Sequence, residues 1–277
     1  MPIVAMTQEM GSLAKDVALE LATHMNLRVM RHEVVDHLAG KLHVPTSVIS
    51  RMREGKASLL ERVKLDKERL ALYSADEVFT QANQGNVVLR GWGATCLLRP
   101  VPHVVCVRIT RSMPQRVAWL MQHLDTDDHE FAQAEIRRSD DAHASRMQQQ
   151  FGVTWGDPVL YDLVLNTDRL SVASCVEQIS ALTQRPEFAE TDSSRKLLDN
   201  LTLAARVRAR LKDTPETSDI NITIEAEQAV VTLSGIVINE HEKREAERVT
   251  SEVEGVHSVN NTLRLMTSKR VFTYAKT

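Results

Sequence analysis

The sequence is poor in the residues that cross-link a chain or bind a structural metal. Its three cysteines, Cys96, Cys106 and Cys175, show no paired spacing. No C-x-x-C pair and no Cys/His cluster occurs, so we expect no zinc or other metal site. Cys106 lies inside an apolar run, where a buried and reduced structural cysteine is the default.

Long apolar runs and a strong charge of one sign are also missing. No run approaches the roughly 18 apolar residues that cross a bilayer, and no basic segment followed by an apolar core indicates a signal peptide. The formal net charge of −3 gives no overall attraction to nucleic acid or to anionic membranes. We therefore expect a cytoplasmic protein. Its 277 residues are enough for a domain of roughly 150–200 residues and a smaller second one.

The N-terminus reads as a strand, a turn and a helix. Residues 3–6 are an apolar run that predicts a buried parallel strand. Residues 7–12 turn the chain, and a helix with Ser12 as its expected N-cap runs to about residue 24. Free backbone N–H groups at such a helix start favour an anion, and Lys15 is close enough to reach a phosphate. The P-loop pattern G-x-x-x-x-G-K-[ST] is absent, so from this stretch alone we prefer an ordinary strand–helix pair of an α/β domain.

The segment from residue 28 to 69 has a helical pattern, broken near Pro45. Within it, residues 38–56 look like a helix-turn-helix. Its basic side chains, which would contact DNA phosphates, are Arg51, Arg53 and Lys56. The alternative is a helical insertion whose charges are simply solvated. We prefer the insertion and do not expect DNA as a partner.

The middle of the chain alternates strands with helices, which favours a parallel sheet with right-handed crossovers. Strands are predicted at 86–89, 104–109 and 161–167. The first is followed by a tight turn formed by Gly91, Trp92 and Gly93. Pro114 suits the first turn of a helix, and Ser171 suits a helix N-cap.

A long polar helix is predicted from Asp127 to about residue 150, with a capping-box-like start. A bare run of charges is usually a solvated helix face. The charged residues that stand out along it are Arg137, Arg138, Asp140 and Arg146.

The last part of the chain reads as a separate unit. Residues 184–196 are polar, contain Pro186 and a serine pair, and predict a linker. Residues 197–268 follow the order helix-strand-strand-helix-strand, which predicts a small α+β domain. Because it offers no nucleophile, base or metal cluster, binding or assembly is its expected role.

Two family resemblances rest on these segments. Residues 1–183 resemble the cytidylate kinase-like branch of the P-loop nucleoside monophosphate kinases, whose fold is a parallel sheet flanked by helices. Residues 197–268 resemble a BON domain. The kinase motifs are T-Q-E-M-G-S, L-R-G-W-G-A, and W-G-D-P with Y-D-L-V-L-N-T; the BON motifs are V-T-L-S-G and G-V-H-S-V-N-N.

The kinase resemblance implies a role for each of these segments. It makes residues 30–80 the monophosphate-binding insertion and residues 127–157 a lid. The implied nucleotide or phosphate contacts are Gly11, Ser12, Lys15 and Asp16 in the loop, and Arg137, Arg138, Asp140 and Arg146 in the lid. The implied acceptor-site candidates are Gly91, Trp92 and Gly93. An active member would use ATP with Mg²⁺ and transfer phosphate to CMP.

The chain departs from the family pattern where the chemistry is done. The family loop reads like S-R-E-x-G-S-G-G, but here Gln8 replaces its arginine, and Leu13 and Ala14 replace two glycines. Trp92 and His143 also stand where the family has arginines. Phosphoryl transfer depends on positioning and on such cations. We therefore expect a nucleotide- or phosphate-binding regulator with a degenerate loop, an unknown cofactor and no assignable catalytic residue.

Three alternatives stay open. The first is a working cytidylate-type kinase, and the second is a DNA-binding regulator acting through residues 38–56. The third is an interaction protein whose first domain is a scaffold and whose BON domain binds a protein or lipid head groups. The oligomeric state is also open.

Overall fold

The structure is a computed structural model of the whole chain. It describes all residues except 31, 43, 54–55, 59–66, 92 and 267–277, and the side chains it describes also exclude those of 32–34, 36, 37 and 53. The chain divides into two compact units, Met1–Asp199 and Asn200–Thr277. Each unit has a hydrophobic core of its own.

The first unit is built on a five-stranded parallel sheet with the strand order β2-β3-β1-β4-β5. Its strands are β1 (Ile3–Gln8), β2 (Arg28–Met30), β3 (Val87–Arg90), β4 (Val104–Thr110) and β5 (Leu163–Asn166). In the central strand, Ile3 pairs with Val87 on one side and with Val104 on the other. This sheet, flanked by helices, confirms the predicted P-loop kinase-like α/β fold.

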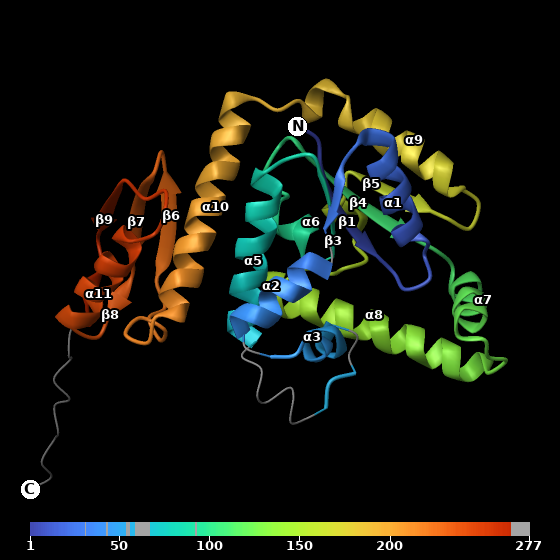
Figure 1. Cartoon of the computed structure of the whole chain (residues 1–277), viewed down its shortest axis with the longest axis horizontal. Helices are drawn as coiled ribbons and strands as arrows, with labels where there is room; N and C mark the ends of the chain where they lie inside the picture. The colour runs from blue at the N-terminus through green and yellow to red at the C-terminus, as the bar shows by residue number, and fades with distance from the viewer. Residues whose placement is uncertain (31, 43, 54–55, 59–66, 92, 267–277) are drawn as a thin grey trace, which may run out of the picture. The chain divides into compact units, whose positions relative to one another are not determined.

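Helices cover both faces of this sheet (Figure 1). The described helices that lie wholly in this unit are α1 (Ala14–Met25), α2 (His32–Leu42), α3 (Thr46–Arg53), α5 (Lys67–Asn83), α6 (Ala94–Leu97), α7 (Met113–Leu124), α8 (His129–Phe151) and α9 (Val172–Thr183), with 3-10 turns η1 (Pro158–Leu160) and η2 (Pro186–Phe188). Helices α1 and α9 pack side by side on one face, whereas α5 and α6 lie against β3 and β1 on the other.

The main core fills the space between the sheet and the α1/α9 pair. Val4 and Met6 of β1 pack there among residues from both helices, including Leu21 and Ile179. Each such side chain contributes about 1.5–3 kcal/mol when fully buried. Because the central strands are covered on both faces, they read as continuous apolar runs rather than alternating ones.

One strand was missing from the sequence prediction. Residues 28–30, predicted as the start of a helical segment, form β2 and pair with β3 through Val29 and Val88. A strand of three residues is too short to show a period of two, and its pairing partner lies almost 60 residues further along the chain. The helical prediction holds for α2, α3 and α5.

The predicted linker at 184–196 contains regular structure. It includes η2, and the helix α10 (Asp192–Asp213) starts five residues before the helix predicted from Leu197. Thr191 caps α10, because its hydroxyl oxygen accepts a hydrogen bond from the Ser194 amide at 3.2 Å. Ser194 returns the contact by accepting from the Thr191 amide at 3.0 Å. The boundary between the two units lies within α10, after Asp199.

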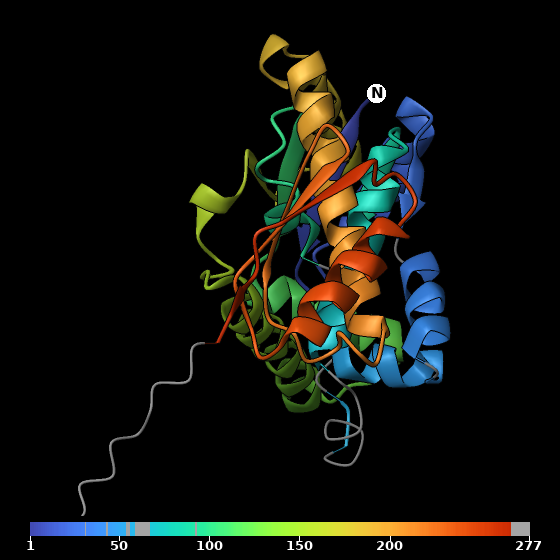
Figure 2. The ribbon, with the colours of Figure 1, turned by 90° about the vertical axis from the view of Figure 1, so that its left-hand side faces the viewer.

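The second unit is a small α+β domain in the predicted order. Its elements after α10 are β6 (Thr223–Glu227), β7 (Val230–Ser234), β8 (Ile236–Val237), α11 (Glu240–Ser251), β9 (Ser258–Asn261) and β10 (Arg264–Leu265). Strands β6, β7 and β9 form one sheet, and β8 pairs with β10. Helix α11 and the C-terminal part of α10 lie beside β6 and β7 (Figure 2). Apolar side chains of these helices and strands form one core.

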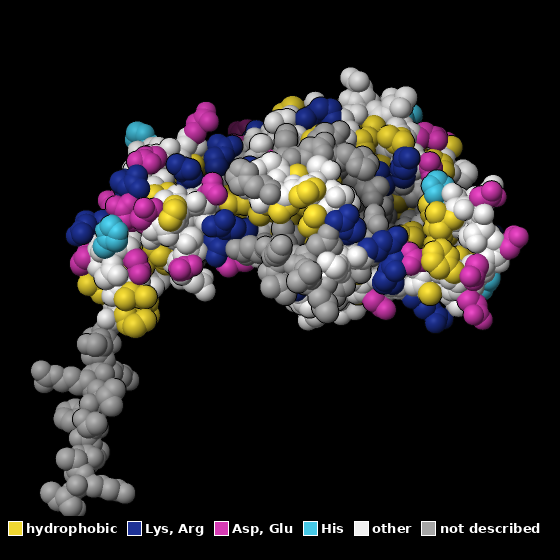
Figure 3. Space-filling view, turned by 60° about the horizontal axis from the view of Figure 1, so that its bottom comes forward, with side chains coloured by type: hydrophobic (Ala, Val, Ile, Leu, Met, Phe, Trp, Pro, Cys, Tyr) yellow, Lys and Arg dark blue, Asp and Glu magenta, His cyan; other side chains and the backbone are white. Residues whose placement is uncertain are grey.

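Two local features of this unit follow from its sequence. Gln228 and Ala229 both have positive φ, 49° and 66°, which suits the tight two-residue turn between β6 and β7. Around the β8–β10 pair, several large apolar side chains are exposed, and Figure 3 shows hydrophobic side chains gathered at one end of this unit. They are Ile236, Ile238, Leu265 and Met266. Among the described helices of the whole chain, none is long and apolar enough to cross a membrane.

Candidate functional site

The loop between β1 and α1 has a repeated left-handed backbone. Gly11 has φ 79° and Leu13 has φ 61°. Ser12, between them, donates its hydroxyl hydrogen to the Glu9 carbonyl oxygen at 2.8 Å. The prediction of Ser12 as N-cap was wrong: Leu13 takes that position and makes no side-chain cap bond, because the Ser12 hydroxyl is used inside the loop.

The start of α1 presents open backbone amides. Among the hydrogen bonds of the described residues, none has the N–H group of Ala14, Lys15 or Asp16 as donor. The Lys15 and Asp16 side chains are exposed on this first turn. Open amides, the positive end of a helix dipole and a lysine together favour an anion here.

Thr167, directly after β5, links the loop to the far edge of the sheet. Its hydroxyl lies 2.9 Å from the Ser12 carbonyl oxygen and 3.3 Å from the Thr110 carbonyl oxygen, both within donating distance. Its neighbour Asp168 accepts hydrogen bonds from the amide and hydroxyl of Ser112, at 3.1 and 3.0 Å. The ends of β1, β4 and β5 are therefore joined at one place.

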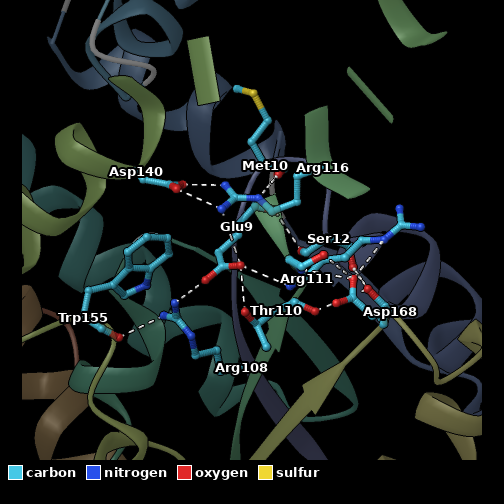
Figure 4. Close-up of polar contacts among 12 residues, drawn as sticks. Glu9, Met10, Ser12, Arg108, Thr110, Arg111, Arg116, Asp140, Trp155 and Asp168 are labelled. Atoms are coloured by element: carbon cyan, nitrogen blue, oxygen red, sulfur yellow. Dashed lines mark hydrogen bonds and ion pairs between the residues drawn. The ribbon is translucent and has the colours of Figure 1, made fainter. Parts of the chain in front are cut away.

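A buried carboxylate, Glu9, lies at the base of the loop (Figure 4). One of its oxygens accepts a hydrogen bond from Arg108 at 2.6 Å. The other accepts from the Thr110 hydroxyl at 2.7 Å and from the Arg111 amide at 3.2 Å. The side chains of Glu9 and Arg108 are only 11% and 9% exposed. The charge of Arg108 is thus neutralised internally.

A second buried arginine, Arg116 of α7, connects the loop to α8. Its Nε donates to the Met10 carbonyl oxygen at 2.7 Å. Its two terminal nitrogens donate to the two carboxylate oxygens of Asp140, at 2.9 and 2.7 Å (Figure 4). A Cβ on Gly11 would lie 3.2 Å from the Arg116 backbone, so the loop packs directly on α7. Of the predicted lid residues, Asp140 is therefore brought to the loop.

Trp155 attaches the end of the lid region to the sheet. Its carbonyl oxygen accepts from Arg108 at 2.9 Å, and the Arg108 guanidinium lies 4.4 Å from its ring centroid. Its indole N–H donates to the Thr7 hydroxyl at 2.9 Å. On α8, the His143 ring stacks on Trp155 with centroids 4.2 Å apart. The aromatic pair thus joins α8 to β1 and β4.

The turn that follows β3 lies under the C-terminal end of α8. Gly91 and Gly93 have φ 80° and 70°. A Cβ on Gly93 would lie 2.5 Å from the Phe151 ring, so that ring rests on the glycine itself. Trp92 lies outside the described residues. Gly93, one of the acceptor-site candidates, is thus covered by Phe151 at the C-terminal end of α8.

The remaining predicted lid residues are spread along α8. Arg137 and Arg138 are exposed, and Arg138 forms an ion pair with Glu135 on the same helix. Arg146 is half-buried, and burial lowers its pKa. Among the described contacts, none joins Arg137 or Arg138 to the loop.

The candidate DNA contacts lie on and after α3. Lys56 forms an ion pair with Glu135 of α8 at 3.2 Å. Arg51 is half-buried and engaged in a contact, and the Arg53 side chain lies outside the described ones. The contact made by Lys56 joins the segment after α3 to α8.

Sequence reasoning did not single out Arg108 or Arg116 as site residues. The sequence nevertheless contains a feature that could have identified each arginine. Arg108 is a charge near the end of the most apolar strand, where it must find a partner. Arg116 lies four residues before Leu120, which places it on the inward face of α7.

Comparison with known proteins supports both units. A model of the cytidylate kinase-like family matches residues 3–169, and a BON domain model matches residues 199–267. Osmotically-inducible protein Y of Escherichia coli is 31% identical over 111 residues, which is 38% of this chain. The chain spans 55% of the length of that relative.

Solved structures also resemble this chain, at low sequence identity. An uncharacterized protein from Eubacterium ventriosum aligns with a TM-score of 0.53 and 19% identity, over 67% of this chain and 100% of that one. Shikimate kinase from Bacteroides thetaiotaomicron gives a TM-score of 0.39 and 15% identity, over 66% and 99%. The family match spans more than half of the chain and covers all five strands of the parallel sheet, the loop after β1, and α8. The protein therefore belongs to the cytidylate kinase-like family and carries a BON domain after its kinase-like domain.

Proposed function

We propose that the kinase-like domain, residues 1–183, binds a nucleotide or another phosphate-bearing ligand at the loop of residues 9–16. The protein uses this binding for regulation and transfers phosphate poorly. The BON domain, residues 197–268, provides the contact with a partner. Lys15 and the open amides of the first turn of α1 hold the phosphate.

The pairing of the two buried arginines is the observation that carries this proposal. Arg108 is neutralised by Glu9, and Arg116 is held by Asp140. Transfer of a phosphoryl group needs cations aimed at the charge that spreads over its oxygens. A cation that must first release its own carboxylate supplies less of that stabilisation, whereas the amides of α1 are open for binding.

The side chains of the loop also support weak phosphoryl transfer. Leu13 and Ala14 stand where the family has glycines, and Ala14 is buried. The loop keeps a left-handed backbone at Leu13 although a side chain is attached there. A phosphate can still meet the backbone N–H groups, but the extra atoms hinder the close wrapping that catalysis requires.

The test is a thermal-shift screen of the full chain against CMP, ATP, cyclic nucleotides and cyclic dinucleotides, with and without Mg²⁺. A ligand that binds only the folded state raises Tm by mass action. We expect such a shift, its loss in Lys15→Ala, and its retention in Lys196→Ala, which removes an exposed lysine on α10. A coupled ADP-release assay should show little or no turnover with CMP. Efficient, magnesium-dependent CMP phosphorylation that Lys15→Ala abolishes would refute the regulatory role.

An active cytidylate-type kinase is the second candidate, favoured by the exposed cations that remain. In that case ATP with Mg²⁺ is the phosphate donor, and Lys15 holds its phosphates. Arg137 and Arg138 on α8 would join them when the lid moves, and Gly91 to Ala94 would line the acceptor site. The ADP-release assay separates this candidate from the first one.

DNA binding through residues 38–56 is a further outcome that can be measured. Salt-dependent binding to duplex DNA that weakens in the Arg51→Ala/Arg53→Ala variant would support it, because phosphate contacts release counterions. Unchanged binding in that variant would exclude these residues as the contact.

The proposal also assigns a cellular compartment to the protein and a kind of partner to its BON domain. We place the protein in the cytoplasm, where nucleoside triphosphates are available and its free cysteines stay reduced. The exposed apolar side chains around the β8–β10 pair favour a protein as the partner of the BON domain. Self-association of the chain is included in that class.

A further inference from the structure

The contact between Arg116 and Asp140 suggests how ligand binding is coupled to the lid helix. We infer that Asp140 occupies the position on Arg116 that a ligand phosphate takes, so that phosphate bound at the loop displaces Asp140 and loosens α8. This inference rests on the proposed function, because it requires an anion at the loop. It adds a regulatory step that the fold alone does not specify.

The geometry makes Asp140 a substitute for phosphate. A guanidinium binds carboxylate and phosphate in the same way, through two parallel N–H···O bonds. Asp140 presents its two oxygens to Arg116 in that fork arrangement, at 2.9 and 2.7 Å. The third donor of Arg116, Nε, is bound to the carbonyl oxygen of Met10, a loop residue. The guanidinium is therefore fixed beside the loop whether or not Asp140 is present.

Of the two partners, Asp140 is the one that can leave. Its side chain is 24% exposed, whereas that of Arg116 is 4% exposed. If Asp140 is displaced, its carboxylate gains water. If Arg116 moved instead, it would lose its bond to Met10 and its ion pair with Glu9 at 3.6 Å.

The charges at the site also favour exchange over simple addition. Arg108 and Arg116 are balanced by Glu9 and Asp140, two positive charges against two negative ones. A phosphate added to this group would face two carboxylates at short range in a buried setting, where like charges repel strongly. Displacement of Asp140 removes one of them and gives the phosphate a cation.

Loss of this pair would loosen one end of the lid attachment. Along α8, Asp140 contacts Arg116, His143 stacks on Trp155, and Phe151 rests on Gly93. Lys56 also forms an ion pair with Glu135 of α8, but among these contacts only that of Asp140 shares its partner with the loop. An anion at the loop therefore acts on α8 through Asp140, while the aromatic contacts keep the C-terminal end of the helix in place.

The first experiment measures pyrophosphate binding to the full chain by titration calorimetry. Asp140→Asn keeps the size of the side chain but removes the competing charge, and should bind pyrophosphate at least about 5-fold more tightly than the unmodified chain. Asp141→Asn is the matched control, because it removes the same charge from an exposed neighbour on the same helix. Equal gains in both variants would mean a general charge effect and would overturn the inference.

The second experiment needs no variant, so it does not depend on the folding of Asp140→Asn. Hydrogen exchange of the unmodified chain is compared with and without saturating pyrophosphate. We expect slower exchange at residues 11–17 and faster exchange at residues 136–143. Protection at the loop with unchanged or slower exchange in α8 would overturn the inference and leave the proposed function standing. No protection at the loop would overturn both.

Discussion

Leu13 and Gly11 hold the same left-handed backbone conformation two residues apart, with φ values of 61° and 79°. Glycine adopts this conformation freely, but in any other L-residue the Cβ atom crowds the following carbonyl, at a cost of about 1–2 kcal/mol. The loop thus keeps a backbone conformation typical of glycine at Leu13, where the family pattern has a glycine. Such strain persists only where the surrounding contacts enforce it.

The strain at Leu13 predicts an inverted order of stability. At most sites glycine is less stable than alanine by about 0.5–1 kcal/mol. Here Leu13→Gly should be more stable than Leu13→Ala by about 1 kcal/mol, because only the glycine variant relieves the strain. Urea denaturation of both variants measures this difference. If Leu13→Ala were instead more stable than Leu13→Gly, residue 13 would have relaxed away from positive φ.

Glu9 should be the most sensitive carboxylate of the site. Glu9→Gln leaves Arg108 and Arg116 without one of their counter-charges, and removal of one partner of a buried ion pair costs about 3–5 kcal/mol. We expect the free energy of unfolding to fall by about 3 kcal/mol, the lower end of that range, because the glutamine amide oxygen still accepts hydrogen bonds. Glu20→Gln, an exposed carboxylate on α1, is the control and should stay within about 0.5 kcal/mol of the unmodified chain. Similar losses of stability in Glu9→Gln and Glu20→Gln would contradict the stabilising role of the Glu9 ion pairs.

His103 predicts a loss of stability in mild acid. Burial lowers its pKa, and this outweighs the opposing effect of Glu190. Its Nδ1 lies 2.8 Å from the Ser194 hydroxyl, while its buried Nε2 has no partner among the described residues. A proton on both nitrogens would thus leave one buried donor unmet.

The sign of the pH effect follows from that shift. Between the folded pKa and the ordinary value of about 6.5, the unfolded chain binds more protons than the folded one. The free energy of unfolding contributed by neutral His103 is therefore present above about pH 6.5 and falls as the pH drops below it. Urea unfolding at pH 7.5 and 5.5 should show a larger loss in the unmodified chain than in His103→Gln. Parallel losses would assign the pH effect to other groups.

The contact between Gly93 and Phe151 predicts an energetic coupling between the β3 turn and the lid helix. Gly93→Ala adds a methyl group at positive φ and brings it against the Phe151 ring. In a Phe151→Ala background the same change should cost about 1 kcal/mol less, because only the backbone strain remains. A double-mutant cycle from urea denaturation gives this value. A coupling near zero would mean that the ring moves aside at no cost.

Much of the fold could be predicted because its signals are local. Asp128 caps α8 by accepting the Phe131 amide at 2.8 Å, and Ser171 caps α9 by accepting the Ser174 amide at 3.0 Å. Pro114 lies in the first turn of α7. Each of these signals depends on residues within one helical turn, so one sequence is enough to see it.

The candidate site could be predicted only in part, because it is assembled from distant residues. Lys15 and Gly11 follow from the loop pattern, but Glu9 meets Arg108 across 99 positions and Arg116 meets Asp140 across 24. No local rule pairs these side chains. Strand β2 was missed for the same reason, since its hydrogen bonds go to a strand far along the chain.

The hydroxyl of Thr167, placed between the carbonyl oxygens of Ser12 and Thr110, has a consequence for biosynthesis. The loop appears first on the ribosome, yet its support arrives 155 residues later. Non-local contacts of this kind form late, after the chain between them has been ordered. A nascent chain released before residue 167 would thus contain the complete loop sequence but not the Thr167 hydroxyl that holds the loop to β4. The native shape of the loop is therefore coupled to completion of the whole sheet.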